Sequence, residues 1–416
     1  MASHRATLGW VAAGQGLSAL GTVVGVRILT QTLDPAVFGV ASLVLGVAAL
    51  ALGLTCTPLT QAAMYFYPSL AAEGRGTILR KTLWRAWRKT LPWVIGGGLI
   101  LAVPYVVGGT ISIWLVLATA ALLFADTWRS INLCLLNVAS EHKRYGIWLT
   151  LEAWGRPLAA TAAVVLVSRS AEAVLWAYTA VSLLLNLSLS GRSTARLADL
   201  QNEDLRQRMW QYALPLVPQG LLGWANGMSN RYMIGGMLSL HETGIYAAAY
   251  GLASRPLLLV NTAFEQFMRP IYQNAVSAGR TAHAAKLLRY WLASLAATCA
   301  VAVLVTIFWS HQLAHLLLGP SFRSGADLIP WVAAGYGVLS LAYVFERVCL
   351  AHGHPRRVLL VESLSGVSAV VLTVAGVHAW GLTGAAVAVP LYFGVQLCAA
   401  FALSRQTRRS YQYRPT

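Results

Sequence analysis

The feature that most constrains this chain is the repeated occurrence of apolar runs long enough to cross a membrane. A helix of about 20 residues spans a bilayer, and only helices or closed barrels satisfy their backbone polar groups in lipid. The runs therefore predict an all-α, polytopic membrane protein with about twelve transmembrane helices. They cover residues 8–30, 37–60, 91–108, 111–137, 145–168, 171–190, 212–238, 243–271, 290–309, 326–350, 358–378 and 381–403.

The composition agrees with a membrane location and argues against binding to nucleic acid. The chain is 57% hydrophobic and only 11% charged, whereas a soluble domain has about a quarter charged residues. Its net charge of +17 comes from short basic segments between apolar runs, as expected beside an anionic membrane face. The five cysteines all lie inside apolar runs without metal-ligand spacing, so we expect no metal site and no cofactor.

The distribution of lysine and arginine predicts the orientation in the membrane. If the N-terminus is cytoplasmic, the cytoplasmic segments hold 22 of the 31 basic residues and the opposite segments hold two, Arg169 and Arg323. This asymmetry follows the positive-inside rule. We therefore expect both termini in the cytoplasm, and a place in the inner membrane of a bacterium.

Two parts of the chain share a spaced pattern of polar residues and glycines, which indicates an internal duplication. In each part a glutamine precedes an arginine by twelve residues, and a glycine farther on precedes a glutamine by twenty-two. We expect two pseudo-symmetric six-helix lobes at 1–190 and 210–404, a cytoplasmic linker at 191–209 and a basic cytoplasmic tail at 405–416. The pattern occurs as Gln15, Arg27, Gly39 and Gln61, and again as Gln219, Arg231, Gly244 and Gln266.

Charged side chains inside the apolar runs are the first candidates for function. A charge at the bilayer centre costs about 2.5–3.5 kcal/mol on insertion scales, so each needs a partner, a water-filled cavity or a route to the interface. The excess of arginine over acid favours an anionic substrate, and guanidinium binds phosphate through two parallel hydrogen bonds. The arginines are Arg27, Arg129, Arg156, Arg231, Arg255, Arg269 and Arg347; we count four acids, Asp126, Glu152, Glu265 and Glu346.

Three of the acids lie three or four residues before an arginine, a spacing that allows an ion pair along one helix. Such pairs have either a purely structural role or a role in substrate binding and ion coupling. Glu346 and Arg347 are adjacent and point apart, and Arg347 lies near enough to its helix end to extend to the interface. The three pairs are Asp126 with Arg129, Glu152 with Arg156, and Glu265 with Arg269.

Three further arginines, Arg27, Arg231 and Arg255, have no acid at helical spacing. The first two lie toward the outer ends of their runs and can extend to the interface. Arg255 lies near the middle of its run beside Pro256, and its equivalent in the first half is Leu50. Arg255 can either contact an anionic substrate or form an ion pair with an acid on another helix.

Amide and aromatic side chains accompany these arginines, as they do in sugar-binding cavities. Hydrogen bonds between helices and anchoring at the interface are the alternative role for such residues. The saccharide candidates are Gln15, Gln219, Asn226, Tyr250 and Gln266. Separately, residues 73–90 predict a basic amphipathic helix on the membrane surface, with Trp84 and Trp87 at headgroup level; it is either a plain connector or a docking site for an acidic headgroup.

The chain resembles the polysaccharide-transport flippases, the Wzx-type O-antigen and exopolysaccharide translocases of the MATE-like MOP superfamily. The resemblance extends over essentially the whole chain. It rests on the opening GQGLSALGTVVGVRILTQTLDPAVFGVASLV and on the later block LPLVPQGLLGWANGMSNRYMIGGMLSLHETGIYAAAYGLA. It implies a MATE-like fold and flipping of a polyprenyl-pyrophosphate-linked oligosaccharide from the cytoplasmic to the periplasmic leaflet by alternating access.

The resemblance also implies residues and partners. Cavity arginines hold the pyrophosphate, and we carry that role to Arg255, Arg231 and Arg27 and, less directly, to Arg129 and Arg156. Membrane lipids, the lipid-linked oligosaccharide and the polysaccharide polymerase and chain-length machinery are the expected partners.

An ion-coupled multidrug exporter of the MATE type is the alternative to a flippase. It would use an essential cavity carboxylate such as Asp126 or Glu152. A membrane enzyme ranks last, because no loop exceeds about thirty residues and such an enzyme would need a large extramembrane loop or a catalytic acid pair facing water.

Overall fold

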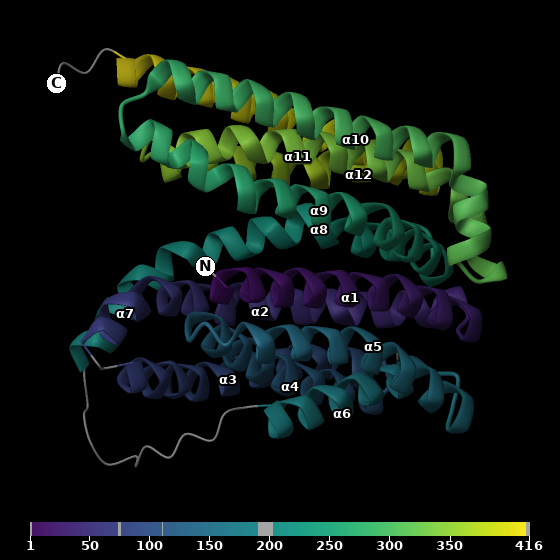
Figure 1. The fold of residues 1–416 in the computed structure, drawn as a ribbon. Helices are drawn as coiled ribbons and strands as arrows, with labels where there is room; N and C mark the ends of the chain where they lie inside the picture. Colours follow the sequence, from purple (N-terminus) through teal and green to yellow (C-terminus); the bar gives the residue numbers. More distant parts are fainter. Residues whose placement is uncertain (1, 74–75, 110, 190–202, 413–416) are drawn as a thin grey trace. The chain divides into compact units, whose positions relative to one another are not determined.

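The computed structural model describes residues 2–73, 76–109, 111–189 and 203–412, and every regular element within these ranges is helical (Figure 1). The chain divides into two compact units. The N-terminal unit contains Met1–Leu33 and Val40–Trp224, and the C-terminal unit contains Asp34–Gly39 and Ala225–Thr416. Two of the three divisions fall inside helices, in α2 and α8, and the third falls between α1 and α2.

Long helices packed side by side build the N-terminal unit. α5 packs against α1 and α6, and α4 packs against α3 and α6. The short α7 continues through a 3₁₀ turn, Leu214–Leu216, into α8. The helices of this unit are α1 (Ala2–Thr32), α2 (Pro35–Ala72) from Val40 onward, α3 (Gly76–Val107), α4 (Ile113–Val138), α5 (His142–Leu166), α6 (Ala171–Leu189), α7 (Glu203–Ala213) and the first part of α8 (Val217–Met237), as far as Trp224.

Long helices also build the C-terminal unit, where α11 packs against α9, α10 and α12. α12 consists of two helices, since Trp380 and Gly381 have non-helical dihedral angles and the φ of Gly381 is +57°. Glycine populates positive φ at little steric cost, which allows the chain to turn here. The helices are α9 (Leu240–Ser277), α10 (Thr281–Leu317), α11 (Ile329–Ala351) and α12 (Pro355–Gln412), with a 3₁₀ helix at Pro320–Leu328.

The expected number of long helices is confirmed for the described residues. Counting α12 as two and setting aside the 11-residue α7 gives twelve. Six segments are apolar and long enough to cross a membrane by length and composition. Several remaining helices, including α5 and α9, carry the buried charges described below, which lowers their mean hydropathy.

Helices α2 and α9 support the internal duplication. Both are 38 residues long, and both their first and their last residues are offset by 205 positions. α3 and α10 begin at the same offset, at Gly76 and Thr281. The start of α9 is fixed by Ser239, whose hydroxyl accepts a hydrogen bond from the backbone N–H of Glu242 at 3.1 Å, as an N-cap residue does.

The stretch 73–90, expected to form a helix at the membrane surface, is helical, but one of its two tryptophans, Trp87, is buried against protein. This stretch, apart from residues 74–75, which lie outside the described residues, forms the first part of α3. Its apolar face is covered by protein: Leu79 and Leu83 are fully buried, and Trp87 is 7% exposed. They pack with Met209 of α7, so burial in this core replaces the lipid contact expected for Trp87.

Two further boundaries differ from those expected. Helix α7 already begins at Glu203, inside the expected linker, of which residues 191–202 lie outside the described residues. The expected tail from residue 405 continues α12 as far as Gln412, and residues 413–416 are outside the described residues as well.

Candidate functional site

Four charged side chains meet in the N-terminal unit, from the adjacent helices α4 and α5. Arg129 Nη1 lies 3.1 Å from Glu152 Oε1, and Arg129 Nε lies 3.5 Å from Asp126 Oδ1. Arg156 Nη1 lies 3.2 Å from Glu152 Oε1, and Arg156 Nη2 contacts Asp126 Oδ1. Each arginine thus contacts both acids. We call these four residues the α4–α5 charge cluster.

Polar groups of α6 surround this cluster. Ser182 is fully buried and donates to Asp126 Oδ1 at 3.4 Å. The guanidinium carbon of Arg156 lies 5.4 Å from the ring centre of Tyr178, a cation–π distance. One turn away, Asn132 Nδ2 donates to Asn186 Oδ1 at 2.9 Å, and Asn186 Nδ2 donates to the Ala125 carbonyl oxygen. α6 therefore completes a polar core inside this unit.

The α4–α5 charge cluster contains two of the expected intrahelical pairs and adds contacts between helices. The two arginines are balanced by two carboxylates, and the side chains of Asp126 and Glu152 are only 5% and 11% exposed. The structure thus brings together two arginines expected at the pyrophosphate and the two acids expected for coupling. Because their guanidinium groups are already paired with carboxylates, Arg129 and Arg156 are poorer candidates for binding the anion of a substrate.

A second cluster in the C-terminal unit has more positive than negative charge. Glu265 Oε1 lies 2.6 Å from Arg347 Nε and 3.2 Å from Arg269 Nη1. Arg347 Nη2 also donates to Glu265 Oε2 at 3.3 Å, which gives the paired geometry that guanidinium favours with carboxylate. One carboxylate is thus shared by two arginines. Arg347 does not extend to the interface as expected, because Glu265 of α9 holds it.

This second cluster borders a cavity of about 310 Å³. Besides Glu265 and Arg269, the cavity is lined by Thr262, Gln266 and Pro270 of the same helix. Gln266 is exposed, so its amide is available to a ligand. An arginine, a glutamine and a threonine beside one partly neutralised carboxylate can bind an anion that carries hydroxyl groups.

A buried chain of hydrogen bonds holds the neighbouring acid, Glu346, which is 1% exposed. Gln396 Nε2 donates to Glu346 Oε1 at 2.8 Å, and Ser365 lies 2.8 Å from Gln396 Oε1. Ser365 Oγ also lies 2.9 Å from Asn226 Oδ1. Asn226, expected as a saccharide contact, is in this structure tied to α12.

Sequence reasoning left three acids of the apolar runs uncounted: Glu172 and Asp327, each the second residue of its run, and Glu362. Glu362 lies within the run 358–378 on α12, and its Oε2 is buried. Because Glu362 lies close to Arg356 and Arg357, near the start of its run, it was not counted among the charges inside the run. Adding these three acids to the four counted from the sequence gives seven acids for seven arginines, so the apolar runs as a whole carry no excess of arginine.

Arg231 lies among tyrosines. Its guanidinium carbon is 5.6 Å from the ring centre of Tyr250. The Tyr250 hydroxyl lies 2.8 Å from that of Tyr336, and Asn230 Nδ2 donates to the Tyr246 hydroxyl at 2.8 Å. Tyr250 is 3% exposed, so its hydroxyl, expected to meet a sugar, is enclosed by protein here.

The remaining sequence candidates belong to neither cluster. Arg27 donates to the side-chain oxygen of Gln31 at 3.0 Å and 3.2 Å when the Gln31 amide is oriented to accept. Arg255 and Gln219 are exposed, and Gln15 is half-buried. Within the described residues, no group of three or more His, Cys, Asp or Glu side chains has the geometry of a metal site.

A family model described as "Polysaccharide biosynthesis protein" matches residues 102–327, which is more than half of the chain. The chain belongs to this polysaccharide biosynthesis family. No curated protein matches the sequence. The family resemblance found in the sequence is confirmed.

Solved structures of flippases and transporters share the fold. The lipid II flippase MurJ in an inward closed conformation superposes with a TM-score of 0.73 at 11% identity, covering 94% of this chain and 87% of MurJ. An inward-facing multidrug resistance MATE transporter of the MOP superfamily gives 0.68 at 11% identity, covering 98% and 95%. A mutant of the Vibrio cholerae MATE transporter VcmN gives 0.63 at 13% identity, covering 97% and 98%.

These similarities confirm the expected fold class, an all-α MATE-like membrane protein. This member of the polysaccharide biosynthesis family is a multi-pass membrane protein with the fold of MOP-superfamily flippases and transporters. The solved proteins named above are transporters and a flippase.

Proposed function

We propose that this protein flips a polyprenyl-pyrophosphate-linked oligosaccharide across the membrane for the synthesis of a cell-surface polysaccharide. The observation that carries the proposal is the family match over residues 102–327 on a fold shared with a lipid II flippase. The substrate crosses from the cytoplasmic to the periplasmic leaflet by alternating access of the two lobes. The protein holds and moves its substrate without a catalytic step or a cofactor.

The C-terminal cluster supports an anionic substrate. Arg347 already satisfies Glu265 with two contacts, so Arg269 supplies a positive charge beyond what that carboxylate requires. Arg269 lines a cavity of about 310 Å³ together with Gln266. The pyrophosphate binds Arg269 there, a saccharide hydroxyl binds Gln266, and the polyprenyl tail remains in lipid. Arg255, Arg231 and Arg27 provide further cationic positions along the path.

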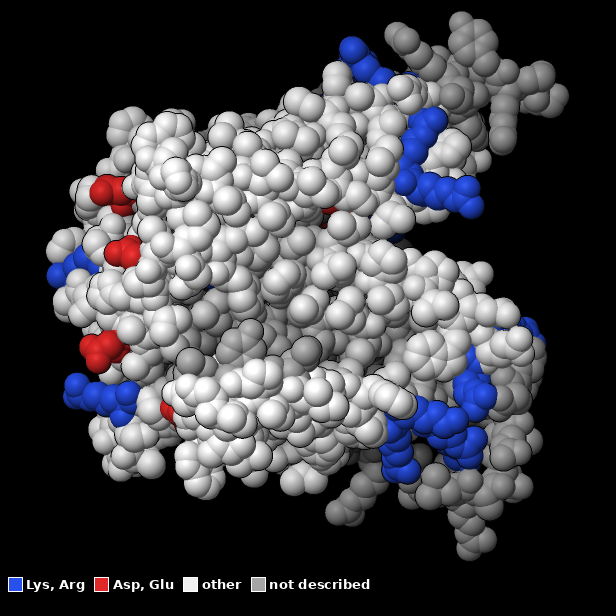
Figure 2. All heavy atoms as spheres, turned by 180° about the vertical axis from the view of Figure 1, so that it is seen from behind, with Lys and Arg blue, Asp and Glu red and all other residues white. Residues whose placement is uncertain are grey.

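The orientation that we propose places both termini in the cytoplasm of a bacterium, in the inner membrane. Figure 2 shows groups of lysine and arginine side chains at one end of each part of the visible surface, and a few more beside the acids at the opposite end. A basic end of this kind faces the cytoplasm by the positive-inside rule. The polysaccharide polymerase and the chain-length machinery are the proteins that would receive the flipped substrate.

A multidrug exporter coupled to an ion gradient is the second candidate. It is supported by the fold shared with MATE transporters and by the buried carboxylates of the α4–α5 charge cluster. In that case Asp126 and Glu152 would exchange a cation or protons while Arg129 and Arg156 hold them in place. The two arginines that share the single carboxylate of Glu265 favour the first proposal, because a cationic drug would be repelled there.

Purified protein in liposomes distinguishes the two candidates. A labelled polyprenyl-pyrophosphate oligosaccharide and a cationic dye are supplied on one side, and the appearance of each on the other side is followed. We expect the pyrophosphate lipid to move and the dye to stay. Movement of the dye alone would reject the flippase proposal and assign the mechanism to the carboxylates.

The variant Arg269→Ala tests the anion site directly. It should lower flipping of the pyrophosphate lipid about tenfold or more, since charge-assisted hydrogen bonds contribute about 1.5–3 kcal/mol each. Glu265 keeps its contacts with Arg347, so the thermal midpoint should change little. Arg289→Ala, which removes an exposed arginine from α10 of the same unit, is the matched control. Equal flipping by both variants would exclude Arg269 from the substrate site.

The variant Arg255→Ala tests the arginine that breaks the symmetry of the two repeats. We expect it to abolish flipping while leaving the amount of folded protein in the membrane unchanged, because Arg255 is exposed on α9. The measurement is the rate of flipping per mole of reconstituted protein. A wild-type rate would remove Arg255 from the path and leave the Arg269 cavity as the anion site.

A further inference from the structure

Two tyrosines of the N-terminal unit stack face to face on its surface. The ring centres of Tyr65 and Tyr212 lie 4.7 Å apart, and their planes differ by 18°. Tyr65 is 62% exposed and Tyr212 is 37% exposed. Tyr65 lies near the end of α2, and Tyr212 lies in α7 just before the turn that leads into α8. We call these two residues the tyrosine pair.

The protein beneath the tyrosine pair holds both rings in place. Phe66 contacts them edge-on, at 5.0 Å and 6.0 Å between ring centres, and packs against a core that includes Met209 and Ala213 of α7. Farther along, α2 and α8 touch backbone to backbone: a Cβ atom at Gly53 would lie 3.2 Å from the Gly220 carbonyl oxygen. The rings are therefore ordered before a ligand arrives, which lowers the entropic cost of binding.

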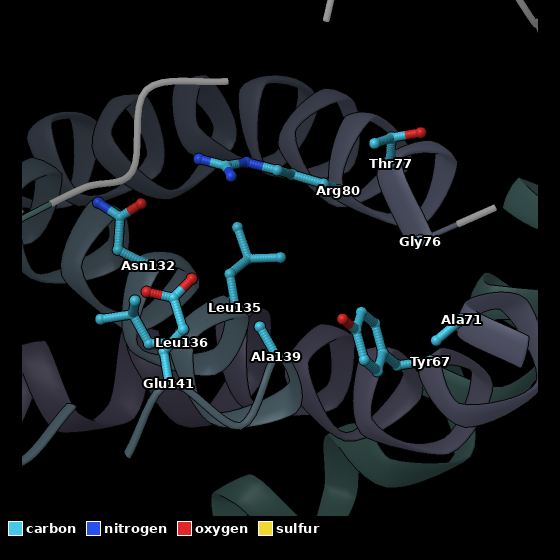
Figure 3. A pocket seen from close by; sticks show the side chains of 10 residues that line it. All are labelled: Tyr67, Ala71, Gly76, Thr77, Arg80, Asn132, Leu135, Leu136, Ala139 and Glu141. Atoms are coloured by element: carbon cyan, nitrogen blue, oxygen red, sulfur yellow. The ribbon is translucent and has the colours of Figure 1, made fainter. Parts of the chain in front are cut away.

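The next tyrosine of α2 faces a different side of the helix. The hydroxyl of Tyr67 points into a cavity of about 350 Å³ that Arg80 and Asn132 also line (Figure 3). Tyr67 itself is half-buried. Because this cavity takes up Tyr67 and not Tyr65, the tyrosine pair is a separate surface that remains open.

The exposed face of α2 that carries Tyr65 also carries polar side chains. Thr57, Gln61 and Tyr65 follow one another at intervals of four residues and are all exposed, so they share one face of the helix. Hydroxyl and amide groups are costly to place against an apolar environment without partners. The glutamine amide can both donate and accept hydrogen bonds, so this face suits a polar ligand that carries hydroxyl groups.

The equivalent face of α9 differs from this one in charge. With the offset of 205 residues, Gln61 corresponds to Gln266, which lines the cavity of the C-terminal unit. Arg269, which lines the same cavity, corresponds to Met64. The whole of α2 contains no charged residue. The α9 face therefore suits an anion, and the α2 face suits an uncharged group that is both apolar and hydroxylated.

We propose that the tyrosine pair and Gln61 bind a sugar ring of the translocated substrate, an inference that rests on the proposed flippase function. The C–H face of the sugar packs on the side of the Tyr65 ring that is turned away from Tyr212, because the face of an aromatic ring is negative and attracts weakly positive C–H groups. The sugar hydroxyls exchange hydrogen bonds with the Gln61 amide and the tyrosine hydroxyls. In the proposed orientation this end of α2 faces the cytoplasm, where the substrate enters.

Equilibrium binding to the full chain in lipid nanodiscs tests this inference. The probes are the polyprenyl-pyrophosphate oligosaccharide extracted from cells that make the polysaccharide, polyprenyl pyrophosphate without a sugar, and a cationic dye. We expect Tyr65→Ala to weaken binding of the first probe about tenfold and to leave binding of the second unchanged. Tyr65→Phe keeps the stacked ring and should retain most of the affinity, and Gln61→Ala should cause a smaller loss than Tyr65→Ala.

The matched control is Tyr290→Ala, which removes a tyrosine of α10 that is 61% exposed. This variant should bind all three probes as the wild type does. A loss of sugar-lipid binding in Tyr290→Ala equal to that in Tyr65→Ala would show that the effect does not belong to the tyrosine pair.

The remaining outcomes separate this inference from the proposed function. Failure of the wild type to bind either pyrophosphate lipid would reject the flippase proposal and the sugar site with it. Unchanged binding of both lipids by Tyr65→Ala and Tyr212→Ala, or equal losses for both lipids, would overturn the sugar site and leave the flippase proposal intact. A loss of dye binding alone in Tyr65→Ala would assign the tyrosine pair to a cation held over the ring face.

Discussion

Replacing Asp126 with alanine is expected to cause the largest loss of stability of any single change in the N-terminal unit. Asp126 contacts both Arg156 and Arg129, and its removal leaves two largely buried guanidinium groups to share Glu152. Breaking a buried ion pair from one side costs about 3–5 kcal/mol, because the remaining charge stays uncompensated. In a unit of this size we expect the thermal midpoint to fall by about 10 °C.

A second substitution separates charge balance from packing. The double variant Asp126→Ala with Arg156→Ala restores equal numbers of acids and arginines, so it should be more stable than Asp126→Ala alone. Asp327→Ala removes an acid from an exposed pair, whose side chains are 70% and 74% accessible, and should change stability by less than about 1 kcal/mol. A double variant less stable than the single one would mean that packing dominates at this site.

The local part of this architecture could be predicted from the sequence. The three intrahelical ion pairs all form, since residues three and four apart on a helix are neighbours whatever surrounds it. The twelve long helices follow from the length of the apolar runs for the same reason. These features depend on spacing along the chain and not on the rotation of one helix against another.

The tertiary part could not be predicted in this way. Arg156 contacts Asp126 thirty residues earlier, and Arg347 contacts Glu265 eighty-two residues earlier. Such contacts depend on which helix faces come together. Trp87 shows the same limit. A basic helix with an apolar face can pack against either lipid or protein, and the sequence does not distinguish the two. In the structure Trp87 packs against protein, in a core shared with α7.

Gly244→Ala is expected to have the largest effect in the C-terminal unit. Gly39 and Gly244 occupy the same position in the two repeats, and they lie against each other at the starts of α2 and α9. A methyl group at Gly244 would lie 3.1 Å from the Gly39 backbone N and 2.6 Å from the Pro35 carbonyl carbon. Backbone atoms cannot rotate away as a side chain can, so the two segments must separate, at a cost of about 1–3 kcal/mol or more.

Gly251→Ala is the matched control, because it makes the same substitution two turns later on α9, where an added Cβ meets no atom within 4 Å. Alanine is favoured over glycine in a helix by about 1 kcal/mol, so this variant should be as stable as the wild type or more so. Gly39→Ala, whose Cβ would lie 3.0 Å from the Gly244 backbone N, should reproduce the loss seen in Gly244→Ala. Equal thermal midpoints for Gly244→Ala and Gly251→Ala would show that the two helix starts do not touch in the native protein. If only Gly39→Ala and Gly244→Ala lose stability and flipping together, this contact between equivalent positions of the two repeats is required for transport.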